Sequence, residues 1–188
     1  MESTGCLEIF QRIAVVGTSG SGKTTMARKL AERLGFKHVE LDSLHWGPDW
    51  TPTPRELFRE RVAEALDGKT WTTDGNYSSV RDIVWKRADT VVWLDYSLAL
   101  VMGRVIRRTI RRSALREELW SGNRESIGTS FMSRDSIILW ALNSYRRRKR
   151  EYPVLFAQPE HAHLRVVRLT TPREAEAWFH SLPERHEP

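Results

Sequence analysis

The stretch Gly17-Thr18-Ser19-Gly20-Ser21-Gly22-Lys23-Thr24 decides the fold of this chain. It fits G-x-x-x-x-G-K-[ST], a phosphate-binding motif when a strand precedes it and a helix follows. An apolar run ends at Val16, and a helical pattern reaches Leu34. The glycines let several N–H groups point at one anion, and the helix start adds a positive dipole end. The sequence therefore predicts a nucleoside triphosphate site made by Gly17, Thr18, Ser19, Gly20, Ser21, Gly22, Lys23, Thr24 and Thr25.

Two side chains at the end of this stretch have specific expected roles. Lys23 is placed to reach the β- and γ-phosphates of a bound triphosphate. The Thr24 hydroxyl is placed to bind Mg²⁺, a hard cation that prefers oxygen ligands and keeps phosphate oxygens and waters in its shell. The alternative, a Gly/Ser turn before an ordinary helix, is disfavoured because the whole motif matches in register. The predicted cofactors are ATP and Mg²⁺.

The composition indicates one globular domain. A chain of 188 residues, 40% hydrophobic and 29% charged, is long enough for one core and short for two. No stretch approaches the roughly 18 apolar residues of a membrane span, and the N-terminus lacks a secretion pattern. A single cysteine, Cys6, excludes an internal disulfide framework and fits a reducing compartment. We expect one domain over residues 1–188, in the cytoplasm and without a membrane partner.

The basic charge balance points to anionic ligands. Thirty Lys and Arg residues against 24 Asp and Glu give a formal charge of +6. This excess does not separate small phosphates from nucleic acid. The tryptophans are scattered from Trp46 to Trp178 and do not form the spaced stacking platform of single-strand binders. A small-molecule partner is favoured, with nucleic acid as the alternative.

Strand and helix patterns alternate along the chain, which favours βαβ units on a parallel sheet and hence an α/β fold. Gly35 follows the first helix where a helix commonly ends. Pro153 is expected to stop a late helix. The expected strands are Ile13–Val16, Phe36–Leu41, Trp71–Thr73, Thr90–Leu94 and Leu164–Leu169, and the expected helices are Lys23–Leu34, Pro54 or Arg55 to Leu66, Ser97–Arg112, Arg134–Glu151 and Pro172–Phe179.

Three carboxylates, Asp42, Asp74 and Asp95, fall at or just past the ends of successive expected strands, where an open parallel sheet binds its ligands. Phosphoryl transfer needs a carboxylate near Mg²⁺ and gains from a second one that accepts the acceptor's proton. Asp74 is preferred over Asp95 as the metal residue because Gly75 lets the chain turn toward the loop. Asp42 is predicted to bind the acceptor or act as general base. A turn aspartate without chemical function is the alternative for each.

Side chains near these carboxylates are candidates for acceptor binding. Trp46 offers a ring face for stacking and His45 a hydrogen bond, although a purely structural role is the alternative for His45. Arg81 is placed to grip a negatively charged acceptor. The predicted substrate-binding residues are Asp42, His45, Trp46, Tyr77 and Arg81.

An arginine-rich helix supplies a candidate clamp. Arginines that close over a triphosphate stabilise the charge of phosphoryl transfer, so Arg104 and Arg108 are predicted to be catalytic, together with Lys23, Asp42 and Asp74. A solvated or nucleic-acid-binding face is the alternative, and Arg146–Arg150 is most simply a solvated face. The expected arginine face comprises Arg104, Arg107, Arg108, Arg111 and Arg112, and the opposite apolar face comprises Leu98, Met102, Val105, Ile106, Thr109 and Ile110.

The chain resembles the adenylate kinase-like branch of small P-loop kinases, and more closely the bacterial DNA topology modulation and adenylate kinase-related proteins. The resemblance rests on the phosphate-binding loop, on Leu41–Trp46, Asp74–Tyr77 and Trp93–Asp95, and on the helices around the arginine-rich segment. It implies a three-layer P-loop fold with a five-stranded parallel sheet, similar to nucleoside monophosphate kinases. It also implies an acceptor-binding region at about 42–70 and a short helical lid at about 112–134 whose arginines close on the phosphates.

The resemblance leaves the acceptor open. Asn76-Tyr77-Ser78 stands where nucleoside monophosphate kinases have Phe-Pro-Arg after their Asp-Gly pair. The stretch around Asp42 is similar to uridine and shikimate kinases, in which an aspartate engages an acceptor hydroxyl. The expected function is therefore an ATP-dependent kinase acting on a nucleotide, a nucleoside or another small alcohol. The alternative is a nucleotide-dependent nucleic-acid-binding protein.

Overall fold

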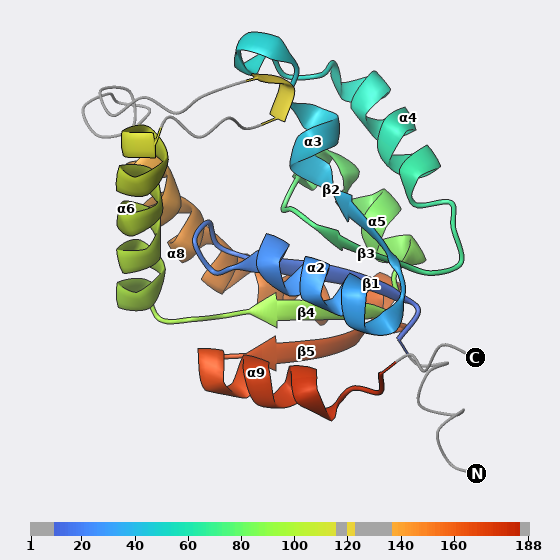
Figure 1. Cartoon of the computed structure of the whole chain (residues 1–188). Helices are drawn as coiled ribbons and strands as arrows, with labels where there is room; N and C mark the ends of the chain where they lie inside the picture. The colour runs from blue at the N-terminus through green and yellow to red at the C-terminus, as the bar shows by residue number, and fades with distance from the viewer. Residues whose placement is uncertain (1–9, 116–119, 123–136, 185–188) are drawn as a thin grey trace.

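A parallel sheet with helices on both faces forms the body of the protein (Figure 1). The computed structural model describes residues 10–115, 120–122 and 137–184. Five strands lie in the order β2-β3-β1-β4-β5, and each neighbouring pair is parallel. The expected five-stranded α/β fold is confirmed. The strands are β1 (Arg12–Gly17), β2 (Lys37–Glu40), β3 (Trp71–Asp74), β4 (Thr90–Leu94) and β5 (Arg165–Leu169).

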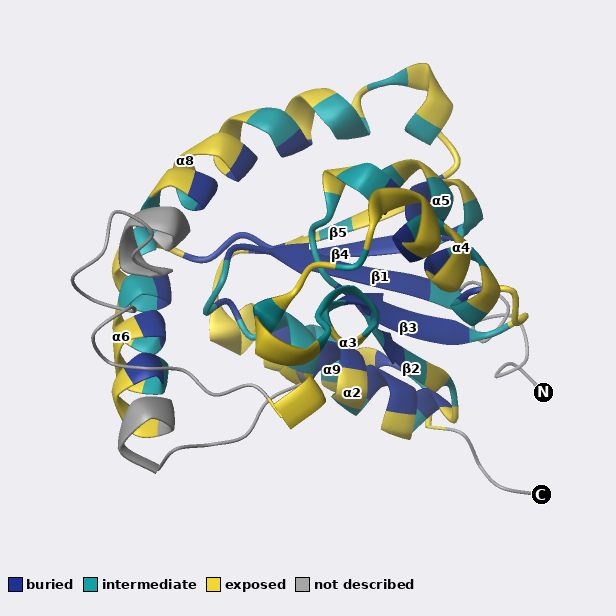
Figure 2. Ribbon diagram, turned by 90° about the horizontal axis from the view of Figure 1, so that it is seen from above, coloured by how far each residue is buried: buried dark blue, intermediate teal, exposed yellow. Residues whose placement is uncertain are grey.

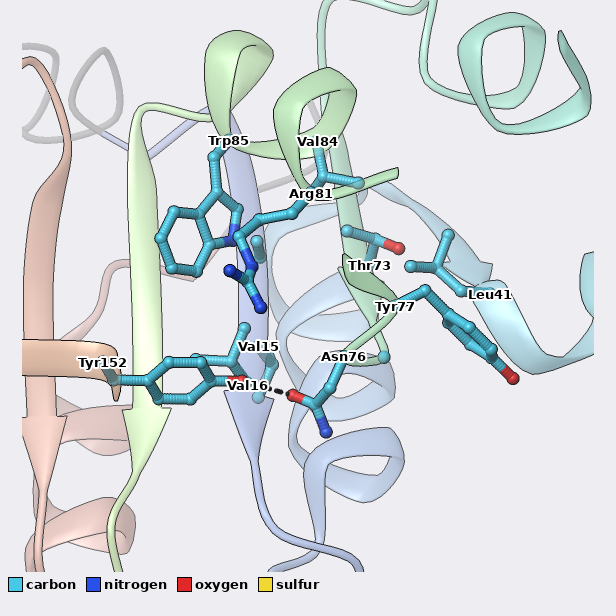
Figure 3. A pocket seen from close by; sticks show the side chains of 12 residues that line it. Val15, Val16, Leu41, Thr73, Asn76, Tyr77, Arg81, Val84, Trp85 and Tyr152 are labelled. Carbon is cyan, nitrogen blue, oxygen red and sulfur yellow. Dashed lines mark hydrogen bonds between the residues drawn. The ribbon is translucent and has the colours of Figure 1, made fainter. Parts of the chain in front are cut away.

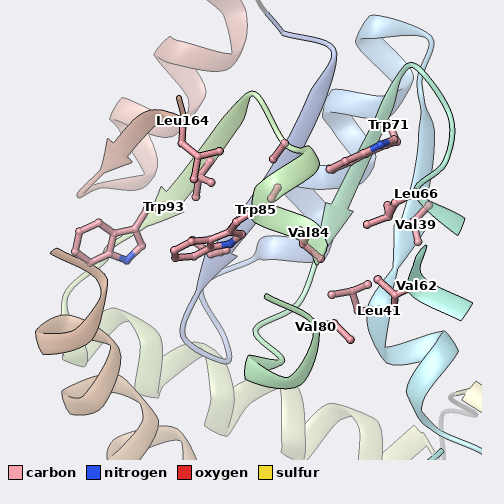
Figure 4. Packing of buried hydrophobic residues seen from close by; sticks show 14 of the residues in the cluster. Val39, Leu41, Val62, Leu66, Trp71, Val80, Val84, Trp85, Trp93 and Leu164 are labelled. Atoms are coloured by element: carbon pink, nitrogen blue, oxygen red, sulfur yellow. The ribbon is translucent and has the colours of Figure 1, made fainter. Parts of the chain in front are cut away.

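Alternating residues of β1 pack on opposite faces of the sheet, because successive side chains of a strand point to opposite sides. Ala14 and Val16 belong to the apolar cluster that includes α4 (Arg55–Ala65), α5 (Arg81–Arg87) and Tyr152 of α8 (Ile137–Phe156), part of which Figure 4 shows. Ile13 and Val15 belong to the cluster with α2 (Lys23–Leu34) and α9 (Pro172–Ser181). The central strands are buried on both faces of the sheet (Figure 2). This explains why β1 is a continuous apolar run rather than an alternation of apolar and polar residues.

The first helix agrees with the sequence prediction at both ends. It spans Lys23–Leu34, and Gly35 adopts a left-handed conformation with φ 66° and donates its backbone N–H to Ala31. Glycine tolerates this conformation without a steric penalty. Strand β2 ends at Glu40 rather than at Leu41, because a short helix, α3 (Leu41–His45), begins there.

Two elements differ from the sequence prediction. Helix α5 was not expected, and α8 was expected to stop before Pro153. Helix α8 instead continues to Phe156 with Pro153 inside it. The turn beyond the proline is held by packing, since Phe156 stacks on Trp85 with ring centroids 5.0 Å apart and lies 5.8 Å from Trp93. Tertiary contacts therefore outweigh the missing proline N–H.

Helix α6 (Leu98–Leu115) stands across the edge of the sheet at the carboxyl ends of β4 and β1 (Figure 1). Up to residue 111, where its described side chains end, the buried positions are Val101, Val105 and Thr109, which are spaced by four. Ile106 and Ile110, predicted to face the core, are instead 38% and 54% exposed. The prediction of a wide apolar face was wrong, because α6 contacts the body of the protein through a narrow stripe.

The predicted lid at 112–134 lies for the most part outside the described residues, apart from the end of α6 and a short 3-10 turn at Trp120–Gly122. It stays a prediction. Among the described residues, no helix has the length and apolar character needed to cross a membrane.

Candidate active site

The loops after β1 and β3 meet at the carboxyl edge of the sheet, because β1 and β3 pair in register and Val15 lies opposite Asp74. Asn76, two residues further on, donates its Nδ2 to the carbonyl of Gly17 at 2.6 Å and accepts the Gly17 N–H at 3.2 Å. The sheet register thus brings the phosphate-binding loop beside the Asp74 segment, as expected for a parallel sheet.

Two loop glycines are required by their surroundings. Gly20 has φ +82°, and a Cβ there would lie 2.6 Å from a methyl group of Val105 and 2.8 Å from the carbonyl of Val101. Gly17 has φ +150°, and its Cβ would lie 2.7 Å from the Leu94 carbonyl. The loop is therefore packed directly against β4 and against the backbone of α6.

A cleft of about 1120 Å³ opens beside this loop. Its walls come from the loop and α2, from α3 and the turn after it, from the segment after β3, and from the arginines of α6 and α8. Its volume suits a nucleotide together with a second small molecule. The described lining residues are Ser19, Gly20, Gly22, Lys23, Thr24, Thr25, Arg28, Glu40, Asp42, Trp46, Trp50, Asp74, Gly75, Asn76, Tyr77, Ser78, Ser79, Arg104, Arg108, Arg111, Arg147 and Arg148.

Thr24 and Asp74 form the pair of oxygen groups predicted for Mg²⁺. The Thr24 hydroxyl donates to Oδ2 of Asp74 at 2.5 Å, and Nε2 of His38 lies 2.9 Å from Oδ1 of the same carboxylate. His38 on β2 thereby orients the Asp74 carboxylate through the oxygen that Thr24 does not contact. A hydroxyl and a carboxylate next to a phosphate-binding loop match the oxygen preference of Mg²⁺, so the residues present fit this ion.

Lys23 lies at the base of the cleft, where its Nζ donates to the Thr18 carbonyl at 3.2 Å. Its pKa is lowered from 10.5 to about 8, mainly by burial and also by the nearby Arg148, whereas Asp74 and Asp42 act in the opposite direction. An ammonium group held among cations and away from water is suited to a strongly anionic ligand.

Two arginines of α6 reach the loop, and their predicted role as a clamp stays a prediction. Arg104 donates to the carbonyl of Ser21, and Arg108 donates to the hydroxyl of Ser19, each at 3.1 Å. Arg111 also lines the cleft, whereas Arg107 is exposed and is not among its lining residues. Arg112, the last member of the predicted face, has a side chain outside the part that the structure describes. Of the others, Arg104, Arg108 and Arg111 face the cleft and Arg107 faces solvent.

The run Arg146–Arg150 is not simply the solvated face that the sequence predicted. Arg147 and Arg148 line the cleft, and Arg148 is only 5% exposed. Burial lowers the pKa of Arg148, and its guanidinium hydrogen-bonds Tyr152. The signal for its burial was the spacing of four that places Ser144, Arg148 and Tyr152 on one face of α8.

The acceptor side of the cleft is organised around Asp42. The hydroxyl of Tyr77 donates to Oδ1 of Asp42 at 2.6 Å, and both residues line the cleft together with Trp46. Burial and the neighbouring Asp42 carboxylate raise the pKa of Tyr77, so its hydroxyl stays a donor. Among the described residues, no hydrogen bond is made to the second carboxylate oxygen of Asp42, Oδ2.

His45 is not among the residues that line the cleft, contrary to its predicted acceptor contact. Its ring packs between Phe58 and Tyr77, with centroids 4.8 Å and 4.6 Å away, and burial lowers its pKa. The structural role left open by the sequence describes this residue better, because an apolar aromatic cluster holds it neutral.

Arg81 also differs from its prediction. It lines a separate cavity of about 20 Å³ behind the loop, together with Asn76, Trp85 and Tyr152 (Figure 3). Its guanidinium lies 5.4 Å from the centre of the Trp85 ring. It is therefore placed behind the phosphate-binding loop rather than against an acceptor in the large cleft.

Asp95, the less favoured metal candidate, is engaged elsewhere. This buried carboxylate accepts from Lys149 at 3.1 Å and from the Nη2 of Arg168 at 2.5 Å. It joins α8 to β5, and it is absent from the residues that line the cleft. The preference for Asp74 over Asp95 as the metal residue stays a prediction.

Comparison with known proteins places the chain in a family. The AAA_18 family model, described as an AAA domain, matches residues 13–109. A shikimate kinase of Gloeobacter violaceus is 32% identical over 48% of this chain and 59% of its own length. A cytidylate kinase of Pyrococcus furiosus is 32% identical over 55% of this chain and 58% of its own length, so the chain spans less than two thirds of either relative.

A solved structure shares the fold along the whole described body. The shikimate kinase from Acinetobacter baumannii, solved in complex with shikimate, superposes with a TM-score of 0.53 at 20% identity, over 94% of this chain and 92% of that one. The strand order, the loop after β1 and the family match all indicate the same fold. The chain belongs to the AAA_18 family of AAA domains and has the fold of a small P-loop kinase.

Proposed function

We propose that the protein is a small-molecule kinase that transfers the γ-phosphoryl group of ATP to a hydroxyl of an acceptor bound beside Asp42. The observation that carries this proposal is the single cleft in which Lys23, the Thr24–Asp74 pair and Asp42 face one another. Phosphoryl transfer needs little covalent chemistry from the protein and depends on positioning and charge stabilisation. This cleft supplies both.

Each residue has a role that its position supports. Asp42 accepts the proton of the acceptor hydroxyl as the hydroxyl oxygen attacks the γ-phosphorus and the bond to the leaving oxygen of ADP breaks. Lys23, Arg104 and Arg108 stabilise the charge on the phosphoryl oxygens during transfer. Thr24 and Asp74 would hold Mg²⁺, which would supply positive charge next to the transferred phosphoryl group.

The acceptor in this proposal is a hydroxyl compound, such as a nucleoside or another small alcohol. Two observations favour this class over a nucleoside monophosphate. Arg81, the residue predicted to grip an acceptor phosphate, lines the small cavity instead. The acceptor wall offers Asp42, Tyr77 and the indole of Trp46, which suit hydroxyl groups and a flat ring face. The curated relatives carry different acceptor names, cytidylate and shikimate, so the names alone select neither class.

The nucleic-acid-binding alternative and the closer likeness to DNA topology modulation proteins stay predictions. The inward placement of Arg104, Arg108 and Arg148 supports the kinase proposal, because these cations serve the cleft rather than an outer surface. Arg107, Arg146 and Arg150 are exposed outside the cleft and are candidates, among the described residues, for contacts with a nucleic-acid backbone.

The test is ADP formation from Mg-ATP in the presence of nucleosides, nucleoside monophosphates and small alcohols, with Lys23→Ala as the inactive control. We expect stimulation by hydroxyl compounds and loss of that stimulation in the control. Stimulation by monophosphates alone would overturn the acceptor class. No stimulation by any compound, combined with nucleotide-dependent binding of DNA, would favour the alternative function.

A matched pair of variants then tests Asp42. Asp42→Asn removes the proton acceptor, whereas Asp49→Asn changes an aspartate at φ 53°, a conformation that Asn also tolerates. We expect the Asp42 variant to lose at least about 100-fold in kcat, with an ATP affinity close to that of the wild type, and the Asp49 variant to keep wild-type kinetics. Equal activity of the two variants would exclude Asp42 as the base.

A further inference from the structure

The entry of the phosphate-binding loop is held by one side chain. Asn76 pairs with both backbone groups of Gly17, since its Nδ2 donates to the carbonyl and its Oδ1 accepts the N–H. Gly17 is the last residue of β1 and the first of the loop motif. The orientation of the Asn76 amide therefore sets where the loop leaves the sheet.

The same amide is held from the far side by α8. The hydroxyl of Tyr152 donates to Oδ1 of Asn76 at 2.8 Å, the contact drawn in Figure 3. Tyr152 is 2% exposed, and its ring packs against Trp85, Trp93 and Phe156. Because this ring is fixed by packing, its hydroxyl gives Asn76 a fixed partner.

Tyr152 is also connected to the cleft through a hydrogen bond. Arg148, one helical turn earlier on α8, hydrogen-bonds the Tyr152 hydroxyl and also lines the cleft. Lys149, the next residue, pairs with Asp95 at the end of β4. Helix α8 is therefore attached to the sheet at the position from which it sends an arginine into the cleft and a hydroxyl to Asn76.

We propose that Tyr152 and Asn76 are positioning residues that couple the docking of α8, and with it Arg148, to the shape of the phosphate-binding loop. The proposal rests on the nucleotide site of the proposed function. With the Tyr152 donor present, Oδ1 of Asn76 accepts two hydrogen bonds and the amide has one orientation. Without it, the amide is held by Gly17 alone, and the loop loses part of its preorganisation for phosphate.

The first test is the affinity for Mg-ATP, measured by calorimetry without an acceptor. Tyr152→Phe removes the hydroxyl and keeps the ring, so the packing against Trp85 and Trp93 is preserved. The hydrogen bond from this hydroxyl to Asn76 is worth roughly 0.5–1.5 kcal/mol, which corresponds to an increase of about two- to twelvefold in Kd. The double-mutant cycle below separates this contribution from that of the bond to Arg148. Tyr145→Phe is the matched control, because Tyr145 lies on the same helix and contacts Lys149 rather than Asn76. We expect its Kd to equal that of the wild type.

The second test is a double-mutant cycle, which a merely structural role would not satisfy. Asn76→Ala removes the contacts with Gly17 and is expected to raise Kd more than Tyr152→Phe does. If the tyrosine acts through Asn76, Tyr152→Phe will have no further effect in the Asn76→Ala background. Thermal melts of all variants separate this coupling from loss of folded protein.

The outcomes are distinct. A wild-type protein that does not bind Mg-ATP would defeat the proposed function and this inference together. A wild type that binds, with a Tyr152→Phe variant of unchanged Kd, would defeat the inference and leave the proposed function standing. The inference would also fail if the tyrosine substitution raised Kd equally in the presence and absence of Asn76.

Discussion

The hydroxyl of Thr24 donates to the carboxylate of Asp74 at 2.5 Å, across the 50 residues that separate them in sequence. This contact places a hydroxyl from α2, which we propose as a Mg²⁺ ligand, beside a carboxylate from β3. We expect Asp74→Asn to lower kcat by about 100-fold or more in Mg²⁺, because the variant loses the charge that holds the ion. Steady-state kinetics over a Mg²⁺ titration measures the effect.

Asp95→Asn is the control for this prediction, since Asp95 pairs with Lys149 and Arg168. Loss of the Asp95 carboxylate should lower Tm, because two ion pairs are broken, and leave the Mg²⁺ dependence of the remaining activity unchanged. A shifted Mg²⁺ requirement in Asp95→Asn, with none in Asp74→Asn, would reverse the assignment of the two carboxylates.

The lowered pKa of Lys23 predicts that ATP binding depends on pH. The free protein titrates this amine at a pKa of about 8, and bound phosphates raise that pKa because they favour the charged form. Below pH 8 the amine is already protonated and affinity is constant. Above pH 8 binding must take up a proton, so affinity falls as pH rises.

Calorimetry at pH 8.5 in two buffers of different ionisation enthalpy measures that proton. We expect an uptake of roughly 0.7 proton per site. Lys23→Arg is the comparison, since an arginine is charged throughout this range and takes up none. Identical apparent enthalpies for the wild type in both buffers would contradict the prediction.

The two sets of arginines on α6 predict different kinetic effects. Arg108 donates to Ser19 of the loop, whereas Arg107 beside it is exposed. Arg108→Ala should lower kcat/KM for ATP by at least about tenfold, because a cation next to the transferred group is lost. Arg107→Ala should leave it unchanged. Equal losses in the two variants would mean that the helix acts through its overall charge.

Gly20 is closely surrounded and Gly103 is not, so substitution by alanine should change the stability in opposite directions at the two positions. Gly20→Ala forces a Cβ to within 2.6 Å of Val105 at φ +82°, and it should cost roughly 1–3 kcal/mol and weaken ATP binding. A Cβ added to Gly103, inside α6, would have no atom outside the helix backbone within 4 Å. Gly103→Ala should gain roughly 0.5–1 kcal/mol. Thermal unfolding measures both changes, and a lower Tm for Gly103→Ala would contradict the account.

The local patterns of the sequence predicted the sheet well, and they placed the loop motif between β1 and α2, whereas phosphate binding by that loop stays a prediction. The loop motif, the full length of α2 and strand β4 follow from short-range rules, because backbone conformation there is decided by residues close in sequence. The pairing of Thr24 with Asp74 also followed, since parallel strands end at one edge.

The predictions that differed concern contacts between distant segments. Arg81 has a position in sequence suited to an acceptor, but its side chain lies over Trp85. Arg148 belongs to a run of charged residues, and composition alone does not show which member of such a run is buried. Its spacing of four from Ser144 and Tyr152 is a signal for burial only once the face of α8 that packs on the sheet is known.

The proline inside α8 has a mechanical consequence. Pro153 has no N–H, so the carbonyl of Lys149 lacks its usual partner along the helix axis. Lys149 and Tyr152 are also the residues that hold the helix to Asp95 and Asn76. A change in the direction of α8 at this turn therefore breaks no axial hydrogen bond between residues 149 and 153. Side chains therefore hold α8 to the sheet at the turn where its backbone lacks a hydrogen bond and bends most easily. The two halves of the helix can change their relative direction about this anchored turn.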